Sequence, residues 1–355
     1  MRLVFFVHSL VSDWNHGNAH FLRGVVRELQ RSGHEVDVYE PADGWSRTNL
    51  AATEGPAAFR EFAERFPDLH SHAYGRDLDL DAAVDHADAV IVHEWNEPQL
   101  VAAIGATSAN ALFHDTHHRA VTAPEEMERF DLSGYAGVLA FGTTVAEVYL
   151  ERAWHDRTWT WHEAADVELF RPLEREQTGE LAWVGNWGDG ERTHELETFL
   201  FEPVRELELS GTIHGVRYPP AGVEAAERSG LTYRGWLPNH RTPEVFADHR
   251  VTVHVPRRPY AEALPGIPTI RVFEALACGI PLVSAPWEDA EQLFRDGDYL
   301  RAETGDEMRE LLAEVLNDEQ LAASLAAAGR ETVLTRHTCA HRADELVSIV
   351  EELHA

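Results

Sequence analysis

Short apolar runs alternate with longer amphipathic segments along most of the chain. Leu3–Val7 is an apolar run that predicts a buried strand, and a polar loop containing Gly17 follows it. Apolar residues then recur at helical spacing over 21–29, which predicts a helix, and Glu35–Tyr39 predicts the next strand. This alternation of strands and helices is typical of α/β proteins with parallel sheets.

Polar residues follow the later predicted strands of the first half. These strands are Ala89–Val92, Ala111–Phe113 and Val138–Phe141, followed by His93-Glu94, His114-Asp115 and Gly142-Thr143-Thr144. Ligands of open parallel sheets bind at the carboxyl ends of strands, so we expect a site among these polar residues. Trp154, Trp159 and Trp161 come next, and clustered tryptophans indicate core packing or, as the alternative, stacking on a sugar.

A polar segment with Pro172, residues 162–179, predicts a linker, after which the α/β pattern restarts. Further strands are predicted at Leu181–Val184, Gly211–His214, Leu231–Arg234, Val251–Val255 and Ile280–Val283. Helices are predicted at Leu196–Leu207, Thr242–Ala247, Thr269–Ala277, Asp306–Leu316, Glu319–Leu334 and Ala340–His354. With 355 residues, the pattern predicts two Rossmann-like domains.

The composition excludes several functional classes. The chain has 61 Asp and Glu against 30 basic residues, all of them Arg, and a net charge of −31. Such acidity argues against binding of nucleic acid or of anionic lipid. Without lysine there is no Schiff-base or P-loop lysine, so Arg, backbone N–H groups or helix N-termini must hold any phosphate. Two cysteines make no disulfide framework, and no apolar run is long enough to span a membrane. We therefore expect a cytoplasmic protein.

The segment from Gly266 to Ser284 combines a tight loop, a helix and a strand. A helix that starts near Thr269 behind a Gly/Pro loop presents free N–H groups to an anion such as a diphosphate. The phosphate-binding candidates are Gly266, Ile267, Pro268, Thr269 and Ile270. Glu274 lies further into the helix, where a carboxylate can accept hydrogen bonds from ribose hydroxyls. The alternative is an ordinary loop–helix–strand unit with a solvated Glu274.

The run Ile270–Val283 resembles the donor-site motif of retaining GT-B glycosyltransferases of the glycosyltransferase 4, or group 1, type, and is most similar to CgeB-like members. That motif carries two glutamates. The second matches Glu274, whereas this chain has Gly266 at the position of the first, with Glu262 nearby as a possible replacement. The resemblance implies an α/β GT-B fold, with two Rossmann-like domains facing a central cleft.

The resemblance extends over nearly the whole chain and divides it into parts. It implies an acceptor-binding domain over 1–165 and a domain over 166–335 that binds a nucleotide-sugar donor. A helix over 336–355 is then expected to cross back to the first domain. Ala165–Phe170 is similar to the segment that joins the two domains in the family.

Trp183–Arg192 resembles the loop that places two cations on the donor phosphates in the family. The second cation matches Arg192, and a neutral amide, Asn186, stands at the first. Possible phosphate or sugar contacts that replace it are Arg217, Arg257, Arg258 and Arg271. The alternative for Arg192 is a solvated loop residue.

In the first half, Leu112–Arg119 is dense in histidine. A zinc site is one interpretation, but the spacing of these histidines lacks helical i, i+4 pairing, so no metal is expected. The resemblance implies instead that His114 lies near the donor sugar as a catalytic residue, with buried structural histidines as the alternative. It also implies that the loop with His16, Gly17 and Asn18 faces donor and acceptor. Asp13 in that loop is a candidate catalytic base.

The predicted function is transfer of a sugar from a nucleoside-diphosphate sugar to an acceptor hydroxyl, with retention and without a metal or other cofactor. One alternative is a nucleotide-sugar epimerase on the same fold. Another is a homologue that binds nucleotide sugars without turnover, which Gly266 and Asn186 motivate. The expected partners are the donor and an acceptor, and the sequence names neither the acceptor nor the oligomeric state.

Overall fold

The computed structural model describes residues 1–355 and contains two parallel sheets. The first sheet has seven strands in the order β3-β2-β1-β4-β5-β6-β7, all paired in parallel. Its strands are β1 (Arg2–Phe6), β2 (Glu35–Pro41), β3 (His72–Tyr74), β4 (Ala89–His93), β5 (Ala111–Asp115), β6 (Gly137–Ala140) and β7 (Thr158–Thr160). The strand order 3-2-1-4-5-6 is that of the doubly wound Rossmann fold, here with one more strand.

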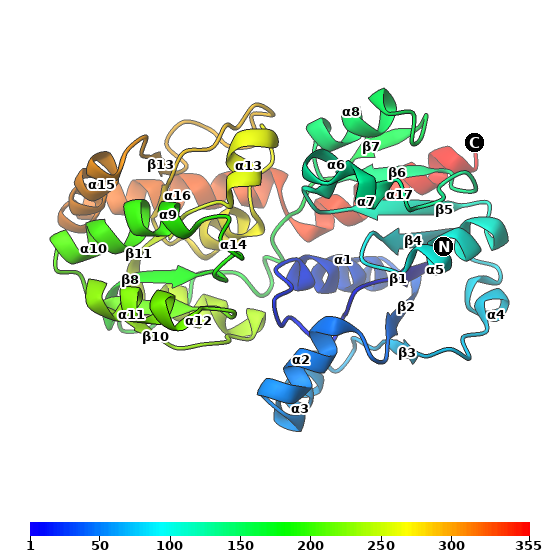
Figure 1. The fold of residues 1–355 in the computed structure, drawn as a ribbon, viewed down its shortest axis with the longest axis horizontal. Coiled ribbons are helices and arrows are strands. Elements are labelled where there is room, and N and C mark those ends of the chain that lie inside the picture. The colour runs from blue at the N-terminus through cyan, green and yellow to red at the C-terminus, as the bar shows by residue number, and fades with distance from the viewer. The chain divides into compact units, whose positions relative to one another are not determined.

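The second sheet repeats this topology with six parallel strands in the order β10-β9-β8-β11-β12-β13. Its strands are β8 (Gly179–Val184), β9 (Gly211–His214), β10 (Leu231–Tyr233), β11 (His249–His254), β12 (Leu282–Ser284) and β13 (Leu300–Arg301). Helices flank both sheets (Figure 1). The α/β class and the two Rossmann-like domains predicted from the sequence are therefore confirmed.

The helices that accompany the first sheet follow its strands in the chain. They are α1 (Ala19–Arg31), α2 (Trp45–Thr53), α3 (Pro56–Arg65), α4 (Leu80–Val84), α5 (Pro98–Thr107), α6 (Arg119–Thr122), α7 (Pro124–Met127), α8 (Thr143–Glu151) and α17 (Cys339–Leu353). The helix α17 packs against α1. The indole N–H of Trp161 also donates to the Arg342 carbonyl at 2.9 Å, which ties α17 to the same part of the chain.

The helices that accompany the second sheet include a helical segment of three parts. They are α9 (Thr193–Leu196), the π-helix η1 (Glu197–Phe201), α10 (Glu202–Glu206), α11 (Pro220–Ser229), the 3-10 helix η2 (Asn239–Arg241), α12 (Thr242–Ala247), α13 (Arg258–Ala263), α14 (Ile270–Cys278), α15 (Gly305–Asn317) and α16 (Glu319–Arg336). The single helix predicted over 196–207 is thus interrupted by a π-helical turn. Gly279 ends α14 in the left-handed conformation at φ +66°, as a helix C-cap glycine does.

The chain forms two compact units. Unit 1 consists of Met1–Glu163 and Cys339–Ala355, and unit 2 consists of Ala164–Thr338. Each unit has its own apolar core between its sheet and its helices; Phe5 and Val90 are buried in the first, Leu181 and Val253 in the second.

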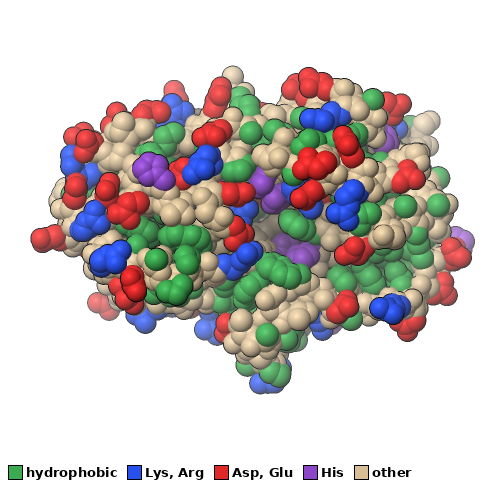
Figure 2. Space-filling model, viewed as in Figure 1, with side chains coloured by type: hydrophobic (Ala, Val, Ile, Leu, Met, Phe, Trp, Pro, Cys, Tyr) green, Lys and Arg blue, Asp and Glu red, His purple; other side chains and the backbone are tan.

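The surface carries the charge of the chain in mixed form. On the face shown in Figure 2, acidic and arginine side chains are interspersed. No helix is both long and apolar enough to cross a membrane.

Candidate functional site

The two sheets each have a topological switch point, where the strand order reverses. In sheet 1 it lies between β1 and β4, and in sheet 2 between β8 and β11. In open α/β sheets, ligands bind at the carboxyl ends of the strands beside such a point. Both switch points carry polar groups at these strand ends, so each is a candidate for part of the site.

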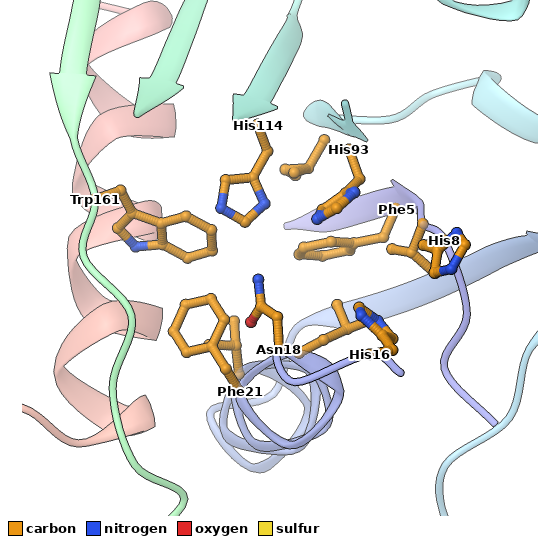
Figure 3. A pocket seen from close by; sticks show the side chains of 12 residues that line it. Phe5, His8, His16, Asn18, Phe21, His93, His114 and Trp161 are labelled. Carbon is orange, nitrogen blue, oxygen red and sulfur yellow. The ribbon is translucent and has the colours of Figure 1, made fainter. Parts of the chain in front are cut away.

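A pocket lies in unit 1 at the switch point of sheet 1 (Figure 3). It is lined by Phe5, Val7, His8, His16, Asn18, Phe21, Leu22, Val25, Ile91, His93, His114 and Trp161. We call it the histidine pocket. Its inner space of about 10 Å³ is close to that of one water-sized group. Most of the lining is apolar, and a few polar atoms converge on it, which is typical of small-molecule sites.

The loop between β1 and α1 supplies His16 and Asn18 to the pocket, and buried polar contacts hold this loop. The Glu40 carboxylate accepts hydrogen bonds from the Ser9 hydroxyl and the Leu10 N–H, both at 2.7 Å. Arg23 donates to the Leu10 carbonyl at 2.8 Å and to Asp13 at 2.9 Å. The loop that carries the site residues is therefore fixed from both sides before any ligand binds.

His16 presents an unpaired nitrogen to the pocket. Its side chain is hydrogen-bonded to the backbone of Ser9, and this bond raises the pKa of the imidazole against the stronger lowering by burial. A bond that raises the pKa is one in which the ring N–H donates to a carbonyl. Since Nε2 has no partner, the donor is Nδ1. Neutral His16 thus keeps the Nε2 lone pair, buried and without a donor.

His114 lies near the carboxyl end of β5, and its side chain points toward Asn18 in Figure 3. Its ring packs against Trp161, with ring centroids 4.7 Å apart, and its Nε2 has no hydrogen-bond partner. The side-chain oxygen of Asn18 is also buried without a partner. Burial lowers the pKa of His114 to about 3, so this imidazole is neutral at physiological pH.

His93 is the other histidine at the carboxyl ends of the central strands, and both of its nitrogens are engaged. Its Nε2 lies 3.0 Å from the Thr116 hydroxyl, and Nδ1 accepts from the Trp95 N–H at 3.3 Å. Thr116 in turn donates to Glu94 at 3.2 Å. Burial first, then the nearby imidazoles, holds the pKa of His93 well below its usual range. A tautomer with the proton on Nε2 satisfies all of these contacts.

Two buried carboxyl groups lie behind the pocket at the ends of the same strands. Burial raises the pKa of Glu94 to about 8 against the opposing charge of Arg119, with which it forms an ion pair. Burial also raises the pKa of Asp115 to about 6, and this side chain accepts from the Tyr149 hydroxyl at 2.9 Å. Neither carboxyl group lines the pocket. They organise the strand ends that hold His93 and His114.

At the switch point of sheet 2, three arginines lie close to one another. The guanidinium of Arg192 donates to the Val255 carbonyl at 3.0 Å and to the Asn186 carbonyl, and its Nε is buried without a partner. Burial, and then the charges of Arg257 and Arg271, lower the pKa of Arg192 to about 10. We call these three residues the arginine cluster. It remains positively charged at neutral pH and lies where Rossmann folds bind phosphates.

The loop after β8 leaves room for the cluster because it contains glycine. Gly188 adopts φ +84°, and a Cβ there would lie 3.0 Å from Nε of Arg192 and 3.5 Å from Nε of Arg257. Two guanidinium groups thus converge on the open side of one glycine. Asn186, predicted at the position of the first cation, uses its side-chain oxygen to accept from the Val216 N–H at 2.9 Å.

The predicted diphosphate loop leads into α14. Thr269 is the N-cap of this helix, and its side chain makes no capping hydrogen bond, so it leaves the first helical N–H groups to other acceptors. Gly266 adopts φ +89° and donates its N–H to the Glu288 carbonyl at 2.7 Å. Ile267 and Ile270 are buried and hold the loop, with Pro268 between them.

Glu274 is fully buried and forms an ion pair with Arg271, one turn earlier in α14. The alternative of a solvated Glu274 is therefore wrong. The pair links the predicted ribose-binding carboxylate to a member of the arginine cluster.

Other predicted site residues lie in ion pairs. Arg217 has φ +64° and pairs with Asp189 at 2.9 Å, and Arg258 pairs with Glu195 at 3.0 Å. Arg257 pairs with Glu191 at 3.3 Å while remaining in the cluster. The carboxylate of Asp13 pairs with Arg23 and does not line the histidine pocket. The alternative of a solvated Arg192 is wrong, because only 8% of this residue is exposed.

The histidine-dense stretch does not form a metal-binding group. No three His, Cys, Asp or Glu side chains lie together in an arrangement that would hold a metal ion. The rings of His117 and His118 contact each other with centroids 4.0 Å apart and planes tilted by 34°, and His118 contacts the Thr122 hydroxyl through Nδ1 at 2.7 Å. Of the three histidines of this stretch, the structure brings only His114 to the pocket.

Comparisons with known proteins show what the chain as a whole is similar to. Residues 192–348 match a family model described as "Glycosyl transferase-like". No curated protein matches the chain by sequence. Solved structures match it over its whole length, at sequence identities that show the fold alone.

Three of these structures illustrate the match. A glycosyltransferase from Rickettsia africae aligns over 99% of this chain and 98% of its own, with 13% identity and a TM-score of 0.68. HepE from Anabaena, solved in complex with UDP and glucose, aligns over 99% and 100%, with 13% identity and a TM-score of 0.70. Sucrose-phosphate synthase from Thermosynechococcus elongatus aligns over 100% and 99%, with 14% identity and a TM-score of 0.66. The chain has the GT-B fold.

Several residues at the two switch points of this GT-B chain were missed from the sequence. In unit 1 they are His8 in the pocket, together with Trp45 and Trp95 beside it. Trp161, singled out in the sequence among the clustered tryptophans, is buried and lines the pocket. The position of His8 directly after the first strand is the signal that would have indicated it. In unit 2, His254 ends β11, and the charge of Arg192 contributes to lowering its pKa to about 3, after burial.

Proposed function

We propose that this GT-B chain is a glycosyltransferase that takes a sugar from a nucleoside-diphosphate sugar, with unit 2 holding the nucleoside diphosphate. The observation that carries the proposal is the arginine cluster at the switch point of sheet 2. Three guanidinium groups lie together there, against Glu191 and Glu274, in a chain with a net charge of −31. Arg257 and Arg271 each pair with a carboxylate, whereas the Arg192 guanidinium donates to backbone carbonyls. The charge of Arg192 is therefore the one available to an anion such as a phosphate.

The chemistry of the reaction fits this cluster. Cleavage of the bond between the anomeric carbon and the diphosphate leaves negative charge on the phosphate oxygens, which guanidinium and helix N–H groups stabilise. Arg192, Arg257 and the start of α14 are the groups that would do so, and Glu274 would bind the ribose. Because these residues supply the positive charge, we propose a reaction without a metal. Retention of anomeric configuration and the CgeB-like subtype rest on the motif resemblance.

The test is binding of nucleoside diphosphates by thermal shift and calorimetry, with UDP, GDP, ADP, dTDP and CDP. We expect one of them to stabilise the protein, since a ligand at about 100 times its Kd adds roughly 2.7 kcal/mol. Arg192→Ala should weaken the diphosphate far more than the matching nucleoside, because it removes a charge-assisted contact to phosphate. The substitution also removes the hydrogen bonds to the Val255 and Asn186 carbonyls, so thermal unfolding without ligand is recorded for this variant as well. Arg258→Ala is the matched control, as Arg258 is paired with Glu195 and 44% of its side chain is exposed.

Products distinguish the alternatives. Incubation with the nucleotide sugar that binds should give a glycoside when an acceptor is present. An isomerised donor formed without acceptor would indicate an epimerase, and neither product under any condition would indicate a binding protein. If no nucleoside diphosphate stabilises the protein, the assignment of unit 2 as the donor domain is wrong.

A further inference from the structure

Two exposed tryptophans lie beside the histidine pocket. The large apolar side chains that remain exposed are Trp45, Trp95 and Leu150, at 46%, 44% and 47%. The ring centroids of Trp45 and Trp95 lie 6.4 Å and 5.9 Å from that of His8, which lines the pocket. Two of the three exposed apolar side chains therefore gather at one place. Such gathering marks a binding surface rather than chance exposure.

Each of the two indoles is held in place by a neighbouring side chain. Trp14 packs edge-on against Trp45 with centroids 5.1 Å apart. The guanidinium of Arg119 lies 4.1 Å from the centroid of the Trp95 ring, and Arg119 is itself paired with buried Glu94. Aromatic surfaces fixed in this way bind a ligand with little loss of side-chain entropy. They form a platform rather than two mobile side chains.

Two polar atoms of the pocket are hydrogen-bond acceptors without a donor. Nε2 of His16 and the side-chain oxygen of Asn18 are buried without partners, and 8% of His16 is exposed. A buried acceptor without a donor is unfavourable, so the pocket is complementary to a group that donates, such as a hydroxyl. Carboxylates and phosphates have no proton to donate to these two atoms. Neutral imidazoles give them no charge to bind.

We propose that Trp45, Trp95 and the histidine pocket form a subsite for a saccharide acceptor. The C–H face of a sugar ring stacks on the indoles, and one hydroxyl enters the pocket and donates to Nε2 of His16. This inference rests on the proposed function, since it names the acceptor of that transferase. His16 binds and orients the hydroxyl; its imidazole is too weak a base, when buried, to be assigned removal of the proton.

A saccharide fits these features better than a flat phenolic acceptor. A sugar ring combines an apolar C–H face with several hydroxyl donors, whereas a simple phenol has one donor. The inner space of about 10 Å³ admits a hydroxyl-sized group and excludes an aromatic ring. The ring of the ligand must then lie outside, where the tryptophans are.

The test measures saccharide binding directly and without a donor, by saturation-transfer NMR. The probes are methyl glucosides, methyl galactosides, maltose and cellobiose, with 4-methylumbelliferone as the phenolic probe. We expect saturation of sugar ring protons in the wild type and roughly tenfold weaker binding in Trp45→Ala and Trp95→Ala, the size expected when an aromatic contact is lost. Leu150→Ala, equally exposed but on α8, should bind like the wild type.

The thermal shift with the nucleoside diphosphate is recorded on every variant, which also shows that each is folded. An unchanged shift with lost saccharide binding supports the proposal. Saccharide binding that both tryptophan variants retain would overturn it, as would binding of 4-methylumbelliferone alone. No saccharide binding beside a normal nucleotide shift overturns the subsite and leaves the proposed function standing. Saccharide binding without any nucleotide shift supports the subsite and contradicts the proposed function.

Discussion

Glu291 occupies the space into which a side chain at Gly266 would project: a Cβ on Gly266 would lie 2.4 Å from Cγ of Glu291 and 3.0 Å from its Oε1. Gly266 also adopts φ +89°, which L-residues rarely do. A side chain at the position where the resembled motif has its first glutamate would therefore collide with Glu291 as placed and strain the backbone. The placement of the Glu291 side chain therefore depends on the presence of glycine at position 266.

We expect Gly266→Ala to destabilise the fold through two separable effects. The left-handed backbone costs an alanine roughly 1 kcal/mol, and overpacking against Glu291 adds roughly 1–3 kcal/mol. Gly297→Ala is the matched control, because Gly297 has φ +90° and a Cβ added there would meet no atom within 4 Å. Denaturant unfolding should show the larger loss at 266, and Glu291→Ala should recover the difference. Equal losses at 266 and 297 would contradict the steric part.

The ion pair within α14 predicts a different ligand profile from that of Arg192. Glu274→Gln should weaken the nucleoside and the nucleoside diphosphate alike, because the ribose is common to both. Arg192→Ala should weaken the diphosphate far more than the nucleoside. Calorimetry with the two ligands measures both affinities. A Glu274 variant with wild-type affinity for both would sink the ribose assignment.

The free energy of unfolding tests the ion pair of Glu274 with Arg271 separately from the role of Glu274 in ligand binding. Glu274 is fully buried and 23% of the Arg271 side chain is exposed, so loss of the carboxylate leaves a partly buried cation. We expect Glu274→Gln to cost roughly 1–3 kcal/mol of unfolding free energy. Arg271→Gln in the same chain should return part of that loss, and strictly additive losses would show that the two side chains are not coupled.

The sequence predicts the sheets of this chain better than its site. The strand predicted at Ala89–Val92 is a short apolar run, and it lies within β4 (Ala89–His93). Strand β3, with an exposed His72, and helix α2 have no such pattern and were missed. Local periodicity reports burial, and marginal elements at a sheet edge bury too little to show it.

Local sequence patterns are limited for the site residues as well. His114 was found because it ends a strand, and a strand end is visible in the sequence. Trp45 and Trp95 lie beside His8 only because β1, β2 and β4 are neighbours in the sheet. Likewise, the approach of Arg257 to Gly188 depends on the pairing of β8 with β11. Such proximity is a property of topology, which the local pattern of residues does not contain.

Buried histidines predict a loss of stability in mild acid. Burial lowers the pKa of His114 to about 3, against 6.5 when the chain is unfolded. Between these values the unfolded state binds a proton that the folded state does not, so stability falls as the pH is lowered from about 6.5 toward 3. Glu94 and Asp115 act in the opposite direction, because burial raises their pKa values to about 8 and about 6. Comparing a His114 variant with the wild type cancels the contribution of Glu94 and Asp115 to the pH dependence, because both proteins contain these two residues.

His114→Gln should reduce the pH slope of the unfolding free energy by about 1.4 kcal/mol per pH unit between pH 4 and 6, which corresponds to one proton. Urea unfolding at several pH values measures the slope. His86→Asn is the control, since 90% of the His86 side chain is exposed and Asn tolerates its left-handed backbone at φ +54°. The same slope in His114→Gln as in the wild type would mean that His114 titrates normally in the folded state.

The buried pair of Asp13 and Arg23 decides between a catalytic and a structural aspartate. The two side chains are 4% and 2% exposed and 2.9 Å apart, and Arg23 also donates to the carbonyls of Leu10 and Val11. Removing one member of such a pair leaves an uncompensated charge. Asp13→Asn should therefore cost roughly 3–5 kcal/mol of stability.

Activity of the folded variants then separates the two interpretations. A base that removes a proton from the acceptor would make kcat of Asp13→Asn fall by roughly 10²–10⁴, with little change in Arg23→Met. A pair that holds the loop of His16 and Asn18 would make both variants lose activity to a similar degree, mainly through a higher KM for the acceptor. We expect the second result, because Asp13 does not line the histidine pocket and its carboxylate is committed to Arg23. Kinetics well below the melting temperature of each variant measure it. A selective collapse of kcat in Asp13→Asn would restore Asp13 as the catalytic base.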